Sequence, residues 1–194
     1  MPNQADSDWQ VLYGRAENVA PRLLGSLFIR ELNGRRLVGK IVETEAYDQA
    51  DAASHSYRGN TARTRVMFGP PGHLYVYFTY GMHFCMNVVT EAEGHGAGVL
   101  IRALEPIEGE DIMRQNRGEG REKTLMNGPG KLCQALGVTM ALGGHDLQEP
   151  PLRLVLQPPL AAADIIRTSR VGISAAKDEP WRFYIRGNTF VSRK

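Results

Sequence analysis

Residues 41–90 read IVETEAYDQADAASHSYRGNTARTRVMFGPPGHLYVYFTYGMHFCMNVVT, and this stretch decides the fold. It opens with a β-rich run, continues as a polar segment containing Ser, Asn and Gly, and closes with two more β-rich runs around Tyr80-Gly81. Valine, tyrosine and phenylalanine favour strands, and a glycine-containing break between two such runs is typical of a hairpin. We therefore expect a strand, a long loop and a hairpin.

Helical and strand patterns surround this stretch. Residues 8–32 carry apolar side chains at a spacing near 3.6, which predicts a helix interrupted near Pro21. VLIRALEP (99–106) predicts a strand, residues 107–126 are helical in character, and NGPGKLCQALGV (127–138) predicts a turn and a short helix that ends at Gly137. LRLVL and RFYIRG, near the end of the chain, predict two further strands.

These elements favour a mixed α/β (α+β) fold. We expect residues 1–194 to form a single domain, with residues 1–7 disordered. Its centre would be a curved, mostly antiparallel β-sheet, flanked by helices and carrying a protruding β-hairpin. If Tyr80-Gly81 is a strict two-residue turn, Tyr77 pairs with Phe84 and Asn87 falls on the opposite face, so a shared pocket would need a bulge.

The composition limits the class of protein. With 194 residues, of which 42% are hydrophobic, the chain can bury a core of its own. A net charge of +2 permits a nucleic-acid partner but does not demand one. Cys85 and Cys133 lack CxxC spacing, which predicts reduced, buried thiols in a cytoplasmic protein. Neither a secretory signal nor a long apolar run is present, so we expect no membrane span.

VETEAY (42–47) carries the strongest candidate chemistry. Alternation along a strand places Glu45 and Tyr47 on one face, roughly 7 Å apart between Cα atoms. A carboxylate beside an aromatic wall suits a pocket that holds a flat ligand and activates water, although a solvated strand face would show the same pattern. The rings of YVYFTYG could likewise form a sheet edge or a platform on which bases stack.

Four basic residues could follow a phosphate backbone, although ordinary surface charge explains them equally well: Arg58, Arg63, Arg65 and Lys131. The five histidines show neither HExxH nor paired-ligand spacing, which predicts that no metal is bound. No GxSxG motif is present, and NGPGK lacks the Walker spacing. We therefore expect no cofactor.

Several blocks together resemble one known family over nearly the whole chain, from about residue 23 to residue 192. The blocks are VETEAY, DAASH, TARTR with MFGPPGHLYVYFTYGMHFCMNVV, VLIRALEP, NGPGKLCQALG and RFYIRG. In order and spacing they are similar to the 3-methyladenine (alkyladenine) DNA glycosylases. The resemblance implies a monomeric, cofactor-free hydrolase of base excision repair. It would flip alkylated or deaminated purines, such as 3-methyladenine, ethenoadenine or hypoxanthine, from double-stranded DNA and leave an abasic site.

The resemblance also assigns roles at the matching positions. Glu45 matches the general base that activates water, and Arg102 with the main-chain carbonyl of Val171 matches the groups that hold this water. Tyr47 and Tyr77 match the two walls that stack on the purine. His55 and the Ala53 backbone match the groups that hydrogen-bond it, and Asn87 matches the residue that rejects guanine.

The remaining assignments concern the duplex. Tyr80, beside Gly81, matches the residue that enters the minor groove and fills the vacated space. The segment between Tyr47 and His55 is one residue shorter than in the vertebrate members and lacks their Gly-Pro, and position 83 is histidine instead of tyrosine. We expect these differences to affect the outline of the pocket and the preferred damage.

Two alternatives remain open on the residues alone. A carbohydrate glycosidase using Glu43 and Glu45 would cleave aryl glycosides and ignore DNA. A binding module without chemistry would show salt-dependent affinity for DNA but release no base.

Overall fold

The computed structural model describes residues 9–79, 81–118 and 124–193. In this part of the chain, the strands belong to one sheet in which all the pairings between them are antiparallel. The strands are β1 (Leu27–Leu32), β2 (Arg35–Tyr47), β3 (Leu74–Thr79), β4 (His83–Val89), β5 (Gly98–Glu108), β6 (Leu152–Val155), β7 (Ile165–Thr168) and β8 (Arg182–Ile185). The prediction of a mixed α/β fold on an antiparallel sheet is confirmed.

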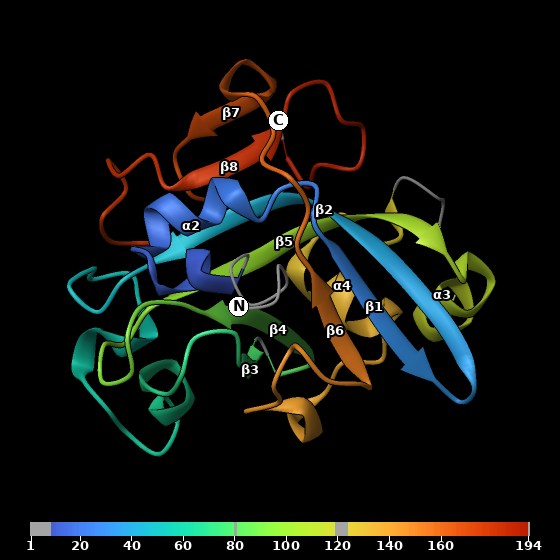
Figure 1. Cartoon of the computed structure of the whole chain (residues 1–194), viewed down its shortest axis with the longest axis horizontal. Helices are drawn as coiled ribbons and strands as arrows, with labels where there is room; N and C mark the ends of the chain where they lie inside the picture. Colours follow the sequence, from blue (N-terminus) through green and yellow to red (C-terminus); the bar gives the residue numbers. More distant parts are fainter. Residues whose placement is uncertain (1–8, 80, 119–123, 194) are drawn as a thin grey trace, which may run out of the picture.

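The strand order is β3-β4-β5-β2-β1-β6, and β8, which also pairs with β7, joins the sheet at β2. Figure 1 shows β2 and β5 crossing the middle of the molecule, with β1 and β6 to one side and β7 and β8 at the top. One edge of β2 pairs with β5. Its other edge pairs first with β1 and then, at residues 43–45, with β8. The end of β2 is therefore enclosed by strands from distant parts of the sequence.

Three α-helices lie in the described residues: α2 (Ala16–Arg22), α3 (Glu110–Arg117) and α4 (Pro129–Ala135). Shorter 3-10 helices are η1 (Gln10–Tyr13), η2 (His55–Arg58), η3 (Arg65–Phe68), η5 (Met140–Leu142) and η6 (Ala162–Asp164). The Thr44 hydroxyl donates to the Ala20 carbonyl of α2 at 2.9 Å. Because successive side chains of a strand point to opposite faces, α2 covers the face opposite to that of Glu45.

The core lies between the sheet and these helices. Fully buried apolar side chains come from α2, from α4 and from the central strands, among them Val19, Leu132, Ile41 and Ile101. Each large apolar side chain removed from water in this way contributes roughly 1.5–3 kcal/mol. The predicted free, buried thiols of Cys85 and Cys133 are confirmed.

The β3–β4 hairpin differs from the two-residue turn considered above. Tyr77 pairs with Cys85, Tyr75 with Asn87 and Thr79 with His83, so three residues rather than two separate the last pair. Directly opposite residues in antiparallel strands share a face. The one-residue change in register therefore brings Tyr77 and Asn87 to the same face, and no bulge is needed.

Two further expectations were wrong. The helical pattern of residues 8–32 ends early, because α2 stops at Arg22, directly after Pro21, and residues 27–32 form β1. Strand β7 was not expected, and among the described strands its pairing partner is β8. Residues 1–7 lie outside the described residues. Within the described ranges, the structure contains no helix of the length and apolar character that crossing a membrane would require.

Candidate active site

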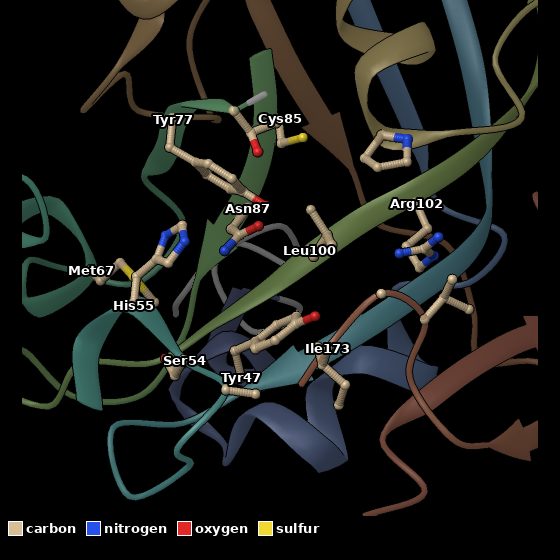
Figure 2. A pocket seen from close by; sticks show the side chains of 15 residues that line it. Tyr47, Ser54, His55, Met67, Tyr77, Cys85, Asn87, Leu100, Arg102 and Ile173 are labelled. Atoms are coloured by element: carbon tan, nitrogen blue, oxygen red, sulfur yellow. The ribbon is translucent and has the colours of Figure 1, made fainter. Parts of the chain in front are cut away.

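A cavity of about 380 Å³ lies on the face of the sheet that carries Tyr77 and Asn87 (Figure 2). Seven of the residues to which the family resemblance gave a role line it: Tyr47, Ala53, His55, Tyr77, Asn87, Arg102 and Val171. They come from four strands, from the 3-10 helix η2 and from two loops. Eight further lining residues were not expected: Ser54, Met67, Thr79, Cys85, Leu100, Pro129, Gly172 and Ile173.

The register of the sheet assembles the floor of this cavity. Asn87 of β4 lies opposite Leu100 of β5, and Leu100 lies opposite Glu45 of β2. These three side chains therefore form a row on one face of the sheet. Arg102, two residues after Leu100 on β5, points to the same side.

Two tyrosine rings form opposite sides of the cavity. Figure 2 shows the Tyr47 and Tyr77 rings across from each other, with Asn87 and Leu100 between them. Tyr77 is held by an edge contact with His55, at 4.5 Å between ring centroids, and by stacking on Tyr75 at 5.6 Å. Burial raises the pKa of both the Tyr47 and the Tyr77 hydroxyl well above the usual range, so both stay neutral. The two faces suit a flat ring inserted between them.

Glu45 lies beneath the Tyr47 side of the cavity and is fully buried. Its Oε1 accepts the Val171 N–H at 2.7 Å. Its Oε2 accepts the Tyr47 hydroxyl at 2.8 Å and an Arg102 N–H at 3.3 Å. Glu45 does not line the cavity, but all three of its partners do. Val171 contacts the carboxylate through its amide N–H, and the water-holding role that the family resemblance gives to its carbonyl stays a prediction.

His55 is fixed by two hydrogen bonds. Its Nδ1 lies 3.0 Å from the Tyr75 hydroxyl, and its Nε2 lies 3.2 Å from Nη2 of Arg63. A guanidinium can only donate, so Nε2 accepts and Nδ1 carries the hydrogen. Burial, and after it the positive charge of Arg63, lower the pKa of His55 to about 4. The imidazole is therefore neutral at pH 7.

The lowered pKa of His55 predicts a pH-dependent stability. Between its ordinary pKa of 6.5 and its folded value of about 4, the unfolded chain binds a proton on His55 that the folded chain does not. Unfolding is then favoured as pH falls through this window. Urea denaturation at pH 7 and pH 5 should show a smaller loss of unfolding free energy for His55→Gln than for the wild type. Equal losses in the two proteins would contradict this.

The loop that carries Ala53 is held by an arginine that the sequence did not single out. Arg170 is buried, donates to the Ala46 carbonyl at 2.9 Å and forms a two-pronged ion pair with Asp51. Its guanidinium also lies 4.8 Å from the centroid of the Tyr47 ring. The Ala53 N–H donates to Asp51 at 2.9 Å. Arg170 thus fixes both the Tyr47 wall and the loop, and adjacency to Val171 was its only cue in the sequence.

Asn87 has an unusual environment. It is 5% exposed, and its side-chain oxygen has no hydrogen-bond partner among the described residues. A buried polar atom without a partner is costly unless a ligand or water satisfies it. Asn87 therefore has a free polar atom in the wall of the cavity.

The basic residues predicted to contact DNA differ in their surroundings. Arg58 and Arg65 are exposed on η2 and η3. Arg63 is exposed too, but its guanidinium contacts His55, and Lys131 donates to Asn127 Oδ1 at 2.8 Å. Gly81 is exposed and has a φ of +69°, a conformation that favours glycine. Tyr80 lies outside the described residues.

One group of possible metal ligands was invisible in the sequence spacing. Asp48, Glu91 and His95 bring one ligand atom each within 4.8 Å of one another. The His95 Nε2 is 2.7 Å from an Asp48 oxygen and 3.3 Å from a Glu91 oxygen. This imidazole already bridges the two carboxylates, and the contact joins the loop after β2 to the loop after β4.

Comparisons with known proteins identify the family of this chain. The family model described as methylpurine-DNA glycosylase (MPG) matches residues 10–189. A protein of Carboxydothermus hydrogenoformans is 54% identical over 177 residues, which cover 91% of this chain and 93% of the relative. A Nitrosospira multiformis protein is 51% identical, covering 91% of this chain and 88% of the relative, and a Methanoculleus marisnigri protein is 51% identical, covering 91% and 93%.

All three relatives are named as candidate 3-methyladenine DNA glycosylases. The family match covers most of the chain, and the relatives align over nearly their full length. The chain therefore belongs to the methylpurine-DNA glycosylase family, whose members are hydrolases of N-glycosyl bonds.

Proposed function

We propose that this protein flips alkylated or deaminated purines out of duplex DNA into the cavity and hydrolyses the N-glycosidic bond with water activated by Glu45. The observation that carries this proposal is a fully buried carboxylate bonded to three residues of a cavity whose opposite sides are tyrosine rings. The products are a free purine and an abasic site.

The proposed recognition step uses the two rings. Flipping a nucleotide costs a few kcal/mol, and less at a damaged or mismatched pair. The base would then lie between Tyr47 and Tyr77. A purine that alkylation has made cationic gains roughly 0.5–2 kcal/mol against an aromatic face. Such a base is therefore favoured over normal bases.

Tyr80 would fill the gap left in the duplex, as wedge side chains do when they enter the minor groove. Exposed apolar side chains on either side of it support a DNA contact at this end of the hairpin, because Phe78 is 51% and Met82 70% exposed. Arg58 and Arg65, both exposed, would contact phosphates. We propose that one molecule acts alone on each damaged site.

The proposed chemistry needs one carboxylate. Glu45 would take a proton from the attacking water and stabilise the positive charge that develops on the sugar, while Arg102 and Val171 would hold that water. A cationic base is already a good leaving group, so no second carboxylic acid is required for it. O-glycosidases generally need two carboxyl groups at the scissile bond. Both oxygens of Glu43 are bonded to Arg102, Arg182 and Ser192, of which only Arg102 lines the cavity, so Glu43 is not placed as a second catalytic carboxyl and a carbohydrate glycosidase is not favoured.

The test is a single-turnover assay with three duplexes, each containing 3-methyladenine, 1,N6-ethenoadenine or hypoxanthine. We expect free base and an abasic site from at least one duplex, and no cleavage of aryl glycosides. DNA affinity that falls with salt but is accompanied by no released base on any duplex would reject the proposal and favour the binding module.

Asn87 should determine which purines enter. Its buried amide would collide with the 2-amino group of guanine, so Asn87→Ala should raise the release of guanine-type bases by about tenfold, in the range that one pocket contact commands. Release of 7-methylguanine and of 3-methyladenine would be compared in both proteins. If the ratio of the two release rates is the same in both proteins, Asn87 does not determine which purines are released.

A further inference from the structure

We propose that Glu43 is a positioning residue for the reaction, and that it acts by holding the Arg102 guanidinium against Glu45 with help from Ser192. This inference rests on the proposed function, because it concerns the same carboxylate. Glu43 itself touches neither the cavity nor the proposed substrate.

Both carboxylate oxygens of Glu43 are fully engaged. Oε1 lies 3.2 Å from Nε of Arg102, 2.7 Å from Nε of Arg182 and 2.9 Å from the Ser192 hydroxyl. Oε2 accepts the Ser192 N–H at 2.6 Å. A buried carboxylate is costly unless it is paired and hydrogen-bonded, and here two guanidiniums and a backbone amide satisfy it. The groups around Glu43 therefore satisfy the hydrogen-bonding capacity of a carboxylate.

Arg102 connects Glu43 to the site. Its Nε is bonded to Glu43, its Nη1 lies 3.3 Å from Glu45, and its Nη2 lies 3.4 Å from the Ser192 hydroxyl. Figure 2 shows Arg102 at the end of the cavity opposite to His55. Burial alone would lower the pKa of Arg102, but the carboxylates of Glu45 and Glu43 raise it above its ordinary value. Because a guanidinium is planar, fixing its Nε side also fixes the direction of Nη1.

The charged groups around Glu45 predict an effect on the pH dependence of the reaction rate. Two carboxylates, Glu43 and Glu45, are buried together with two guanidiniums, Arg102 and Arg182. When Glu43 loses its charge, the positive charges act on Glu45 alone. The acidic limb of the pH–rate profile should then move to lower pH, whereas the loss of a residue that only supports the fold would leave this limb where it is.

The experiment compares wild type, Glu43→Gln and Ser192→Ala in single-turnover release of ethenoadenine across pH. Glu43→Gln should react about 10- to 100-fold more slowly at neutral pH, as expected for a misdirected catalytic group. The acidic limb of its pH–rate profile should move to lower pH, and its affinity for the duplex should stay unchanged. Ser192→Ala, which keeps the backbone N–H to Glu43, should show a smaller loss of rate.

The matched control is Glu105→Gln on the same strand as Arg102. Glu105 is partly exposed and pairs with Lys40 and Asn188, away from Glu45, so its rate and profile should match the wild type. A wild-type rate in Glu43→Gln, or a loss with an unmoved acidic limb, would overturn the inference. If Glu43→Gln does not fold, an unaltered rate in Ser192→Ala would overturn it instead. If the wild type itself releases no base, the proposed function is wrong, and this outcome is distinct from a failure of the Glu43 inference alone.

Discussion

Glu45→Gln should slow single-turnover base release by about 10²- to 10⁴-fold, the range that a positioned general base contributes. Glutamine has the same shape, so it can still accept the Val171 N–H and hydrogen-bond the Tyr47 hydroxyl. It cannot take a proton from water. The measurement is the rate of release from an ethenoadenine or 3-methyladenine duplex with enzyme in excess, which removes product release from the rate.

The control for this prediction is again Glu105→Gln. This substitution removes a carboxylate that lies on the same sheet but outside the site. It should react at the wild-type rate. Binding of the damaged duplex by Glu45→Gln should be close to that of the wild type, since Glu45 does not line the cavity. Release at more than a tenth of the wild-type rate would mean that Glu45 is not the base.

The second large effect concerns Tyr47, which is both a wall of the cavity and a donor to Glu45. Stacking of a base on an aromatic side chain is worth roughly 1–3 kcal/mol, so Tyr47→Ala should lower kcat/KM by about 5- to 150-fold from stacking alone. Tyr47→Ala also removes one of the two rings that the Arg170 guanidinium faces, the other being that of Trp181. The total loss should therefore reach the upper part of this range.

Tyr47→Phe separates the two roles. It keeps the ring and the contact with Arg170 but removes the hydroxyl that donates to Glu45 at 2.8 Å. Affinity for the damaged duplex should be near that of the wild type, with any loss confined to the rate of release. If Phe and Ala at this position weaken binding equally, the ring of Tyr47 does not stack on the purine.

The strands around the site could be predicted because their signals are local. VETEAY alternates along β2, and Tyr47 does meet Glu45 as that alternation requires. The register of the β3–β4 hairpin could not be predicted from the sequence. When the loop is one residue longer, each residue of β3 pairs with a residue of β4 whose side chain points to the other face. Residues 27–32 have helical spacing, but pairing with β2 and β6 overrides that weak local preference.

The contacts that hold the site together join residues far apart in the sequence. Arg170 and Asp51 are separated by 119 positions, and Glu43 and Ser192 by 149. No local periodicity reports such pairs, and a single arginine or serine in a loop gives no signal of its own. The family resemblance gave roles to Glu45 and to residues that line the cavity, but not to residues such as Arg170 and Glu43 that hold them.

The most direct test is a crystal structure of Glu45→Gln bound to a duplex with one ethenoadenine. We expect the purine between the Tyr47 and Tyr77 rings, out of the helical stack, with the sugar C1′ directed toward residue 45. A damaged base still stacked in the duplex, or bound elsewhere with the cavity between the two rings empty, would contradict the proposed function.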